Sequence, residues 1–175
     1  MKTLITGTEE QRTSLKMLFH KDFGFEETHS LLGVELNQYD YVFDLDLDNQ
    51  PELVHHYVDA EDLTLICSAV KLSLSELSVI GELSNKINLV GINALPGFLG
   101  RSVVELSFYD FKSEDAFNLL NKELKWDFEK VKDRVGMASP RVIFMIINEA
   151  CYTLQEGTSD ITSIDQAMKL GTNYP

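Results

Sequence analysis

Residues 2–11 carry the sequence Lys-Thr-Leu-Ile-Thr-Gly-Thr-Glu-Glu-Gln, which sets the character of the fold. Residues 2–6 are short and apolar enough to favour a strand, and Gly7 ends it. Thr8 and Gln11 have the Thr-x-x-Gln spacing of a capping box, which predicts a helix immediately after the glycine. Leu15, Leu18 and Phe19 continue that helix at helical spacing. The sequence therefore predicts a strand, a tight turn and a helix.

Further strands and helices alternate along the chain to about residue 131. Strands are predicted at 39–47, 63–68, 88–92, 103–108 and 126–131, and helices at 51–57, 75–83 and 113–124. Ser113 is expected to cap the last of these helices, with Glu114 and Asp115 in its first turn, where acids complement the helix dipole. This alternation favours an α/β fold with a Rossmann-like, mostly parallel sheet covered on both faces.

The pattern changes near Gly136. One long apolar helix is predicted over 140–155, because Pro140 is tolerated in a first turn and Gly157 stops the helix. A second, short helix is expected to start at Thr162 and to end at Gly171. We therefore predict a domain over 1–135 and a short all-α C-terminal tail over 136–175. The tail is too small to own a core and must pack on something.

Composition narrows the classes of partner. The 175 residues include 28 acidic and 15 basic side chains, for a formal net charge of −13. Such a surface repels phosphate backbones and anionic lipid, so neither nucleic acid nor a membrane is an expected partner. The longest apolar stretch, 142–147, is far too short to span a bilayer.

The two cysteines indicate the compartment. Cys67 and Cys151 lie far apart in apolar or helical runs, and both are expected to be small buried hydrophobes. They form no disulfide framework, which favours a reducing, cytoplasmic location. The segment before Gly7 is too short for a signal peptide.

Several segments resemble bacterial 3-hydroxyacyl-CoA dehydrogenases. Residues 141–150, 154–157 and 164–175 are similar to the start of the family's C-terminal helical domain. Val90-Gly91-Ile92 and Val103-Val104-Glu105-Leu106 resemble the family's Gly-Leu-His and Leu-Val-Glu-Val segments. Residues 39–44 and 65–77 extend the resemblance more weakly. It implies a Rossmann-like fold, here reduced, for hydride transfer between NAD and an acyl-CoA.

The resemblance also assigns the catalytic positions. Asn93 stands at the family's histidine and Glu105 at the glutamate that orients it, twelve residues on as in the family. Val70 stands at the serine position and Pro140 at the asparagine position. An amide does not titrate near pH 7, and Val70 and Pro140 have no side-chain donor. Without the resemblance, Asn93 and Glu105 are equally well explained as polar residues that end a strand.

The family's Gly-x-Gly-x-x-Gly turn corresponds here to residues 7–12, Gly-Thr-Glu-Glu-Gln-Arg, where only Gly7 is kept. Side chains at Glu9 and Arg12 are expected to obstruct close approach of a pyrophosphate, and Glu9 and Glu10 to repel it. Glu26 and Glu27 are the nearest candidates for an acid that holds the ribose. NAD is therefore not expected to bind. The four histidines have no metal-ligand spacing with cysteine, so no metal is expected.

Two functions follow from the resemblance. The first is a dehydrogenase-like protein with degraded NAD and catalytic sites, acting as a binding or regulatory homodimer through the helix at 140–155, with acyl-CoA as a candidate ligand. Family members continue beyond the position of Pro175, and this helix would otherwise be exposed. The second is a divergent NAD-dependent L-3-hydroxyacyl-CoA dehydrogenase that acts on short-chain acyl-CoA in fatty acid metabolism.

Overall fold

The structure is a computed structural model that describes residues 1–171. The chain forms two compact units, Met1–Met137 and a second unit that begins at Ala138. Each unit is described by itself.

The first unit is built on one seven-stranded sheet with the order β2-β1-β3-β4-β5-β6-β7. Neighbouring strands are parallel except for the antiparallel pair β5 and β6. This confirms the predicted Rossmann-like, mostly parallel sheet. The strands are β1 (Thr3–Thr6), β2 (Glu26–Glu27), β3 (Tyr41–Asp44), β4 (Thr64–Ser68), β5 (Asn88–Ile92), β6 (Val103–Phe108) and β7 (Asp127–Val131).

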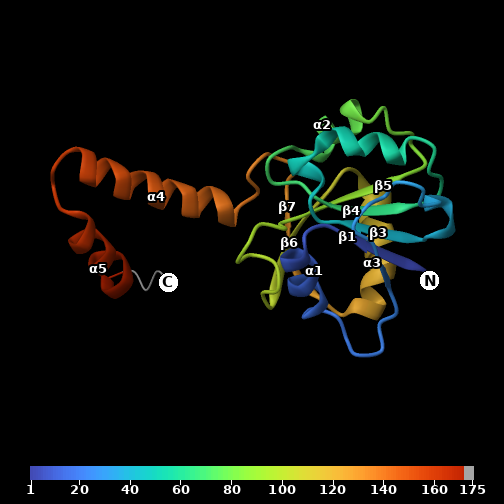
Figure 1. Cartoon of the computed structure of the whole chain (residues 1–175), viewed down its shortest axis with the longest axis horizontal. Coiled ribbons are helices and arrows are strands. Elements are labelled where there is room, and N and C mark those ends of the chain that lie inside the picture. The colour runs from blue at the N-terminus through green and yellow to red at the C-terminus, as the bar shows by residue number, and fades with distance from the viewer. Residues whose placement is uncertain (172–175) are drawn as a thin grey trace. The chain divides into compact units, whose positions relative to one another are not determined.

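Helices cover both faces of this sheet. Figure 1 shows α2 on one face and α1 and α3 on the other. Each face buries its own apolar cluster, one around Leu65 and Tyr57 and the other around Phe43 and Phe117. The helical elements are α1 (Glu9–Lys16), α2 (Leu74–Ile80) and α3 (Phe111–Leu124), with short 3-10 turns η1 (Leu36–Gln38), η2 (Leu47–Asn49) and η3 (Pro51–Tyr57).

The N-terminal caps of α1 and α3 test the helix starts that the sequence predicted. The capping box of α1 is confirmed, since the Gln11 N–H donates to Thr8 Oγ1 at 3.3 Å and the Thr8 N–H donates to Gln11 Oε1 at 2.9 Å. The predicted cap of α3 was wrong. Asp110 is the cap, and it accepts from both the N–H and the hydroxyl of Ser113 at 2.8 Å. Both residue types can cap a helix, and Asp110 precedes the first helical residue whereas Ser113 already lies within the first turn of α3.

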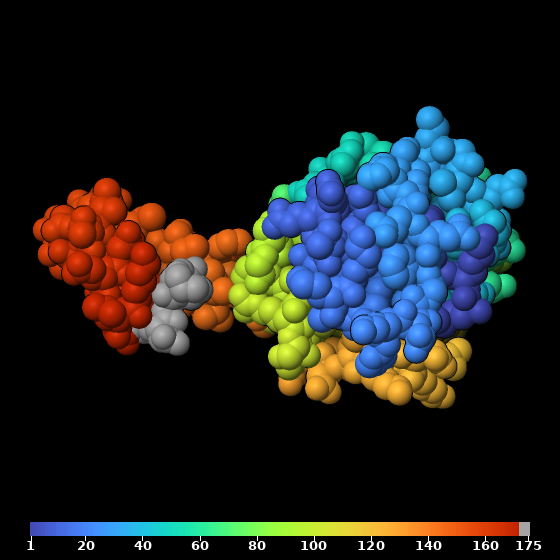
Figure 2. All heavy atoms as spheres, turned by 60° about the horizontal axis from the view of Figure 1, so that its bottom comes forward, coloured from blue at the N-terminus to red at the C-terminus, as the bar shows by residue number. Residues whose placement is uncertain are grey.

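The strand β2 was not predicted. It consists of two glutamates, Glu26 and Glu27, which have low strand propensity and no apolar alternation. It forms because it pairs in parallel with Leu4 and Ile5 of β1. Figure 2 shows the blue segment around it spread over one side of the first unit.

The second unit is a pair of helices, α4 (Ser139–Gln155) and α5 (Ile161–Gly171). Pro140 lies in the first turn of α4, and Gly157 ends the helix with a left-handed φ of 70°. Asp160 accepts from the N–H of Ser163 at 2.9 Å and so caps α5. The four residues at 172–175, part of the family-like segment, lie outside the described residues.

Neither helix of the second unit has a buried residue apart from Pro140. Cys67 is buried in β4 as predicted, but Cys151 on α4 is exposed, and the expectation that it would be buried was wrong. The apolar neighbours of Cys151 along α4 suggested burial, yet those neighbours are themselves exposed. Over residues 1–171, no helix is both long and apolar enough to cross a membrane.

Candidate ligand site at the carboxyl edge of the sheet

Asn93 and Glu105, which the resemblance places in catalysis, lie side by side. Asn93 follows the end of β5, and Glu105 lies on the neighbouring antiparallel strand β6. Asn93 Nδ2 donates to Glu105 Oε2 at 3.2 Å, and the Asn93 N–H donates to the Glu105 backbone oxygen at 3.3 Å. The amide, only 4% exposed, therefore sits where a base hydrogen-bonded to Glu105 would sit.

Val70 and Pro140 are the residues that the resemblance places at the two other catalytic positions. Val70 follows β4, and its buried side chain belongs to the apolar cluster on the α2 face. Its backbone oxygen accepts from the Gly136 N–H. Pro140 belongs to the second unit, in the first turn of α4. Neither side chain can donate or accept a hydrogen bond.

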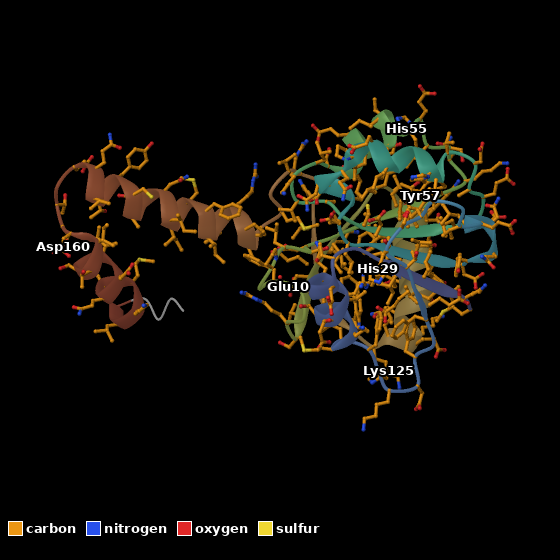
Figure 3. The ribbon with its side chains drawn as sticks, in the orientation of Figure 1. Glu10, His29, His55, Tyr57, Lys125 and Asp160 are labelled. Atoms are coloured by element: carbon orange, nitrogen blue, oxygen red, sulfur yellow. The ribbon has the colours of Figure 1, made fainter. Side chains whose placement is uncertain are left out.

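The backbone conformation and the packing around Gly7 both require a glycine at this position. Its φ is 133°, which disfavours any residue with a side chain. A Cβ there would lie 2.9 Å from Leu45 Cβ and 3.1 Å from Gln11 Oε1. The turn after β1 is thus packed against the end of β3 and the first turn of α1. Glu9 and Glu10 lie exposed in the first turn of α1, and Glu10 is labelled in Figure 3.

The Arg12 side chain turns back toward β1 and β2. Its Nη1 donates to the Gly7 backbone oxygen, and its Nε donates to Glu27 Oε2 at 3.1 Å. Lys16 pairs with the other oxygen of the same carboxylate at 3.1 Å. The bonds from Lys16 and then Arg12 lower the pKa of Glu27 below its usual value. The carboxylate at the end of β2 is therefore already bound within the chain.

Asp48, a buried acid of η2, ties two loops together at this edge. Its carboxylate accepts from the Ser68 hydroxyl at 2.6 Å and from the N–H groups of Val70 and Lys71 at 2.8 and 2.9 Å. The Asp48 N–H in turn donates to Ser68 Oγ at 3.2 Å. The residues after β3 and after β4 are thereby fixed to each other.

A cavity of about 380 Å³ opens at the carboxyl ends of β1 and β3. Ligands of open α/β sheets bind at this edge, outside the carboxyl ends of the strands. Its walls are completed by the loop after β2 and by η3. The residues that line it are Thr6, Gly7, Thr8, His29, Ser30, Leu31, Asp44, Asp46, Gln50, Leu53 and His56.

Asp44, at the end of β3, is the buried ionisable group of this cavity. Its side chain is removed from water, and Tyr57 Oη donates to Asp44 Oδ2 at 2.9 Å. Desolvation raises the pKa of Asp44 to about 6, against the opposing effect of the Tyr57 hydrogen bond. Burial, followed by the adjacent Asp44, raises the pKa of Tyr57 well above its usual value.

The sequence had placed Asp44 only in a strand, and its role at the cavity was missed. Burial of an acid at a strand end depends on segments far apart in the chain, so a local pattern could not reveal it. His29 and Tyr57, labelled in Figure 3, come from the loop after β2 and from η3. Within residues 1–171, no three His, Cys, Asp or Glu side chains are grouped so that they could hold a metal ion.

Comparison with known proteins identifies the second unit. Residues 136–175 match the family model described as the C-terminal domain of 3-hydroxyacyl-CoA dehydrogenase. The probable 3-hydroxybutyryl-CoA dehydrogenase of Bacillus subtilis is 46% identical over 46 residues, which are 26% of this chain and 16% of that protein. Over this C-terminal segment the chain is similar to the 3-hydroxyacyl-CoA dehydrogenases.

A second relative shares the same limited coverage. The 3-hydroxyadipyl-CoA dehydrogenase of Escherichia coli is 48% identical over 46 residues, 26% of this chain and 10% of that protein. The chain thus spans less than a fifth of the length of each of these two curated relatives. In both comparisons the aligned segment is about a quarter of this chain.

Solved dehydrogenase structures extend the likeness in fold to the first unit. The (S)-3-hydroxybutyryl-CoA dehydrogenase of Ralstonia eutropha superposes with a TM-score of 0.71 at 17% identity, covering 99% of this chain and 78% of that one. An NAD+-dependent dismutase, a pyridine carboxylic acid 5-dehydrogenase, gives 0.72 at 13% identity over 97% of this chain and 70% of that one. At such identities the likeness concerns the fold. The chain therefore combines a C-terminal segment similar to that family with a Rossmann-like sheet of the same fold as these dehydrogenases.

Proposed function

We propose that this chain is a 3-hydroxyacyl-CoA dehydrogenase-like protein that does not turn over NAD and instead acts as a self-associating binding or regulatory protein in the cytoplasm. The observation that carries the proposal is the Arg12 side chain, bound to the Gly7 oxygen and to Glu27 at the turn after β1. This turn and the end of β2 are where a Rossmann fold holds a pyrophosphate and a ribose.

The residues of this turn do not fit NAD. A dinucleotide turn needs glycines so that backbone amides can approach the diphosphate at a helix N-terminus. Here the N-terminus of α1 is closed by the Thr8–Gln11 capping box, and two glutamates flank it. Glu27, the acid in the position for a ribose hydroxyl, is engaged by Arg12 and Lys16. Binding of NAD would require these bonds to be broken.

The catalytic positions support the same conclusion. Hydroxyl oxidation needs a base whose pKa suits proton transfer near neutral pH, and the Asn93 amide cannot serve. Val70 and Pro140 add no polar group to the site. The retained Glu105 accepts a hydrogen bond from Asn93, whose side-chain amide does not titrate near pH 7.

The self-association rests on the apolar surface of α4. Val142, Met145 and Tyr152 are 60%, 66% and 59% exposed, and Phe144 and Ile147 are also exposed on other sides of the helix. Helices of soluble proteins normally bury their apolar side. Exposed apolar surface of this kind marks an interface, and we propose that a second copy of the chain covers it. Acyl-CoA is the candidate ligand of such a dimer.

The test uses the purified full chain. Calorimetric titrations with NADH and with acetoacetyl-CoA, and an assay of acetoacetyl-CoA-dependent NADH oxidation, are expected to give neither NADH binding nor turnover. Sedimentation over a range of concentrations is expected to show a dimer. Robust NADH oxidation would overturn the non-catalytic part, and a monomer at every concentration would overturn the self-association.

A second candidate is a divergent NAD-dependent L-3-hydroxyacyl-CoA dehydrogenase that acts on short-chain acyl-CoA in fatty acid metabolism. The 3.2 Å contact between Asn93 and Glu105 favours it, since the pair keeps the neighbourhood that catalysis in the family would need. This candidate requires NAD, so the NADH titration separates the two functions. Binding of acetoacetyl-CoA alone would support a carrier or sensor.

A further inference from the structure

The cavity at the carboxyl ends of β1 and β3 is lined by a hydroxyl that is not used in a hydrogen bond within the described residues. Thr6 is 7% exposed and lines the cavity, and its hydroxyl makes no side-chain hydrogen bond within residues 1–171. Buried polar groups of proteins are normally hydrogen-bonded. Thr6 Oγ1 is not among the fully enclosed atoms, so this hydroxyl is open to the cavity and free to bond to a ligand that enters it.

Asp44 lies beside this hydroxyl. Thr6 and Asp44 are register partners in the parallel pair β1 and β3, and both follow residues of the α2-face cluster, Leu4 and Val42, by two positions. Their side chains therefore point to the same face of the sheet. Adjacent strands are about 4.8 Å apart, so one donor group can reach both side chains.

The Asp44 carboxylate is itself incompletely bonded. Oδ2 accepts from Tyr57 at 2.9 Å, whereas Oδ1 accepts only a long bond of 3.4 Å from the Asp46 N–H. The lining of the cavity includes a second carboxylate, Asp46, but no lysine or arginine. A buried carboxylate is normally paired with a cation, because its desolvation is costly otherwise.

We infer that this cavity binds small organic cations, with a primary ammonium group held between the Asp44 carboxylate and the Thr6 hydroxyl. An ammonium has three donors and no acceptor, which suits two acceptors on neighbouring strands. Anionic ligands such as phosphates are excluded by Asp44 and Asp46. His29 and His56 line the exposed rim, and the volume of about 380 Å³ accommodates a short carbon chain behind the ammonium.

This inference goes beyond the proposed function and does not depend on it, since the cavity lies wholly within the first unit. The ligand is a small molecule of a different class from NAD or acyl-CoA. It also accounts for a buried acid that would otherwise reduce stability near neutral pH, a feature that is typical of functional sites.

The test compares two probes of equal size on the full chain at pH 7.2. One is 4-aminobutan-1-ol and the other is butane-1,4-diol, which replaces the ammonium with a hydroxyl. Binding is followed by amide chemical shifts of residues 6–8 and 44–46. The amine is expected to give saturable shifts with a Kd below about 10 mM, and the diol is expected to give none.

Substitutions of Asp44 and Thr6 test whether these two side chains bind the amine. Asp44→Asn, which keeps the shape and the Tyr57 bond, is expected to weaken amine binding at least tenfold, and Thr6→Val about threefold or more. Asp62→Asn removes an equal charge from an exposed residue remote from the cavity and is expected to leave the affinity unchanged. Circular dichroism checks that each variant is folded.

Three results would overturn the inference. These are equal binding of the amine and the diol, unchanged affinity of a folded Asp44→Asn variant, and the absence of saturable shifts with the amine in this concentration range. A dimer or a monomer in sedimentation affects none of them, so failure here and failure of the proposed function are distinguishable.

Discussion

The two units of this chain differ in where their apolar side chains lie. The first unit buries them in two clusters, one on each face of the sheet, whereas the helices of the second unit bury only Pro140. A unit with two closed clusters can be stable alone, but two helices with exposed apolar sides cannot supply a comparable core. The first unit buries a core of its own, whereas the second unit leaves its apolar side chains exposed.

The largest expected effect comes from removing a buried aromatic ring from the core of the first unit. Phe117 is fully buried in α3 and lies within 6.3 Å of the Trp126 ring centroid. Phe117→Ala is expected to lower the free energy of unfolding by about 3–5 kcal/mol, because it deletes buried contacts and leaves a void. Urea unfolding followed by fluorescence of Trp126, the single tryptophan of the chain, measures the first unit.

Phe111 is the matched control, since it is also a phenylalanine of α3 but is 70% exposed. Phe111→Ala is expected to change the free energy of unfolding by less than about 0.5 kcal/mol. Equal effects of the two substitutions would contradict the burial of this helix face.

The next largest effect concerns the second unit. Met145→Glu places a charge on the exposed apolar side of α4 and is expected to weaken self-association by about 2–4 kcal/mol, as at an interface hot spot. Sedimentation equilibrium measures this change, and the Trp126 unfolding curve is expected to stay the same. Leu119→Glu, at a similarly exposed apolar position of α3, should leave the association intact. A dimer that tolerates Met145→Glu would place its interface elsewhere.

A smaller effect should depend on pH. The folded pKa of Asp44 is about 6, above its usual value of 3.8, so the folded state holds a proton that the unfolded state releases between these pH values. Stability from this group is therefore present below about pH 4 and falls as pH rises to about 6. The total change is roughly 3 kcal/mol for a shift of about two units.

Asp44→Asn removes that dependence. The variant is expected to match the wild type near pH 4 and to be more stable by about 2–3 kcal/mol at pH 7.5. The comparison of the two proteins at each pH cancels the opposing effect of acids such as Glu27, whose pKa is lowered. An equal difference in stability at pH 4.5 and 7.5 would contradict the raised pKa of Asp44.

The smallest effect is at a helix cap. Thr8→Ala removes the acceptor for the Gln11 N–H and is expected to destabilise the first unit by about 1 kcal/mol. Asp160→Ala removes the equivalent acceptor from α5 and should leave the Trp126 transition unchanged. A shift of that transition by Asp160→Ala would show that the stabilities of the two units are coupled.

The sequence predicted the parts of the fold that rest on local contacts. The capping box at Thr8 and the buried strands were recognisable because their signals lie within a few residues. The strand at Glu26–Glu27 was missed because it depends on pairing with β1, and on Arg12 and Lys16, which come from another element. The cap at Asp110 was missed because Asp110 and Ser113, three positions apart, are both of a residue type that caps helices.

The residues of the candidate site also fall into those that the sequence predicted and those that only the structure shows. The resemblance placed Asn93 and Glu105 twelve residues apart, and the antiparallel turn between β5 and β6 brings them into contact. Asp44 and Thr6, by contrast, are 38 positions apart and carry no motif. Their juxtaposition follows from the parallel register of β1 and β3, which becomes known only with the structure.

The Asp48 carboxylate has a consequence for hydrogen exchange. It holds the N–H groups of Val70 and Lys71, which lie outside any strand or helix, and release of either would leave a buried acid with one donor fewer. These two amides should therefore exchange with deuterium on the slow timescale of the β4 core, through opening of the whole sheet. We then expect the segment after β4 to stay closed over minutes and any change on ligand binding to fall in the other segments that line the cavity, the loop after β2 and η3.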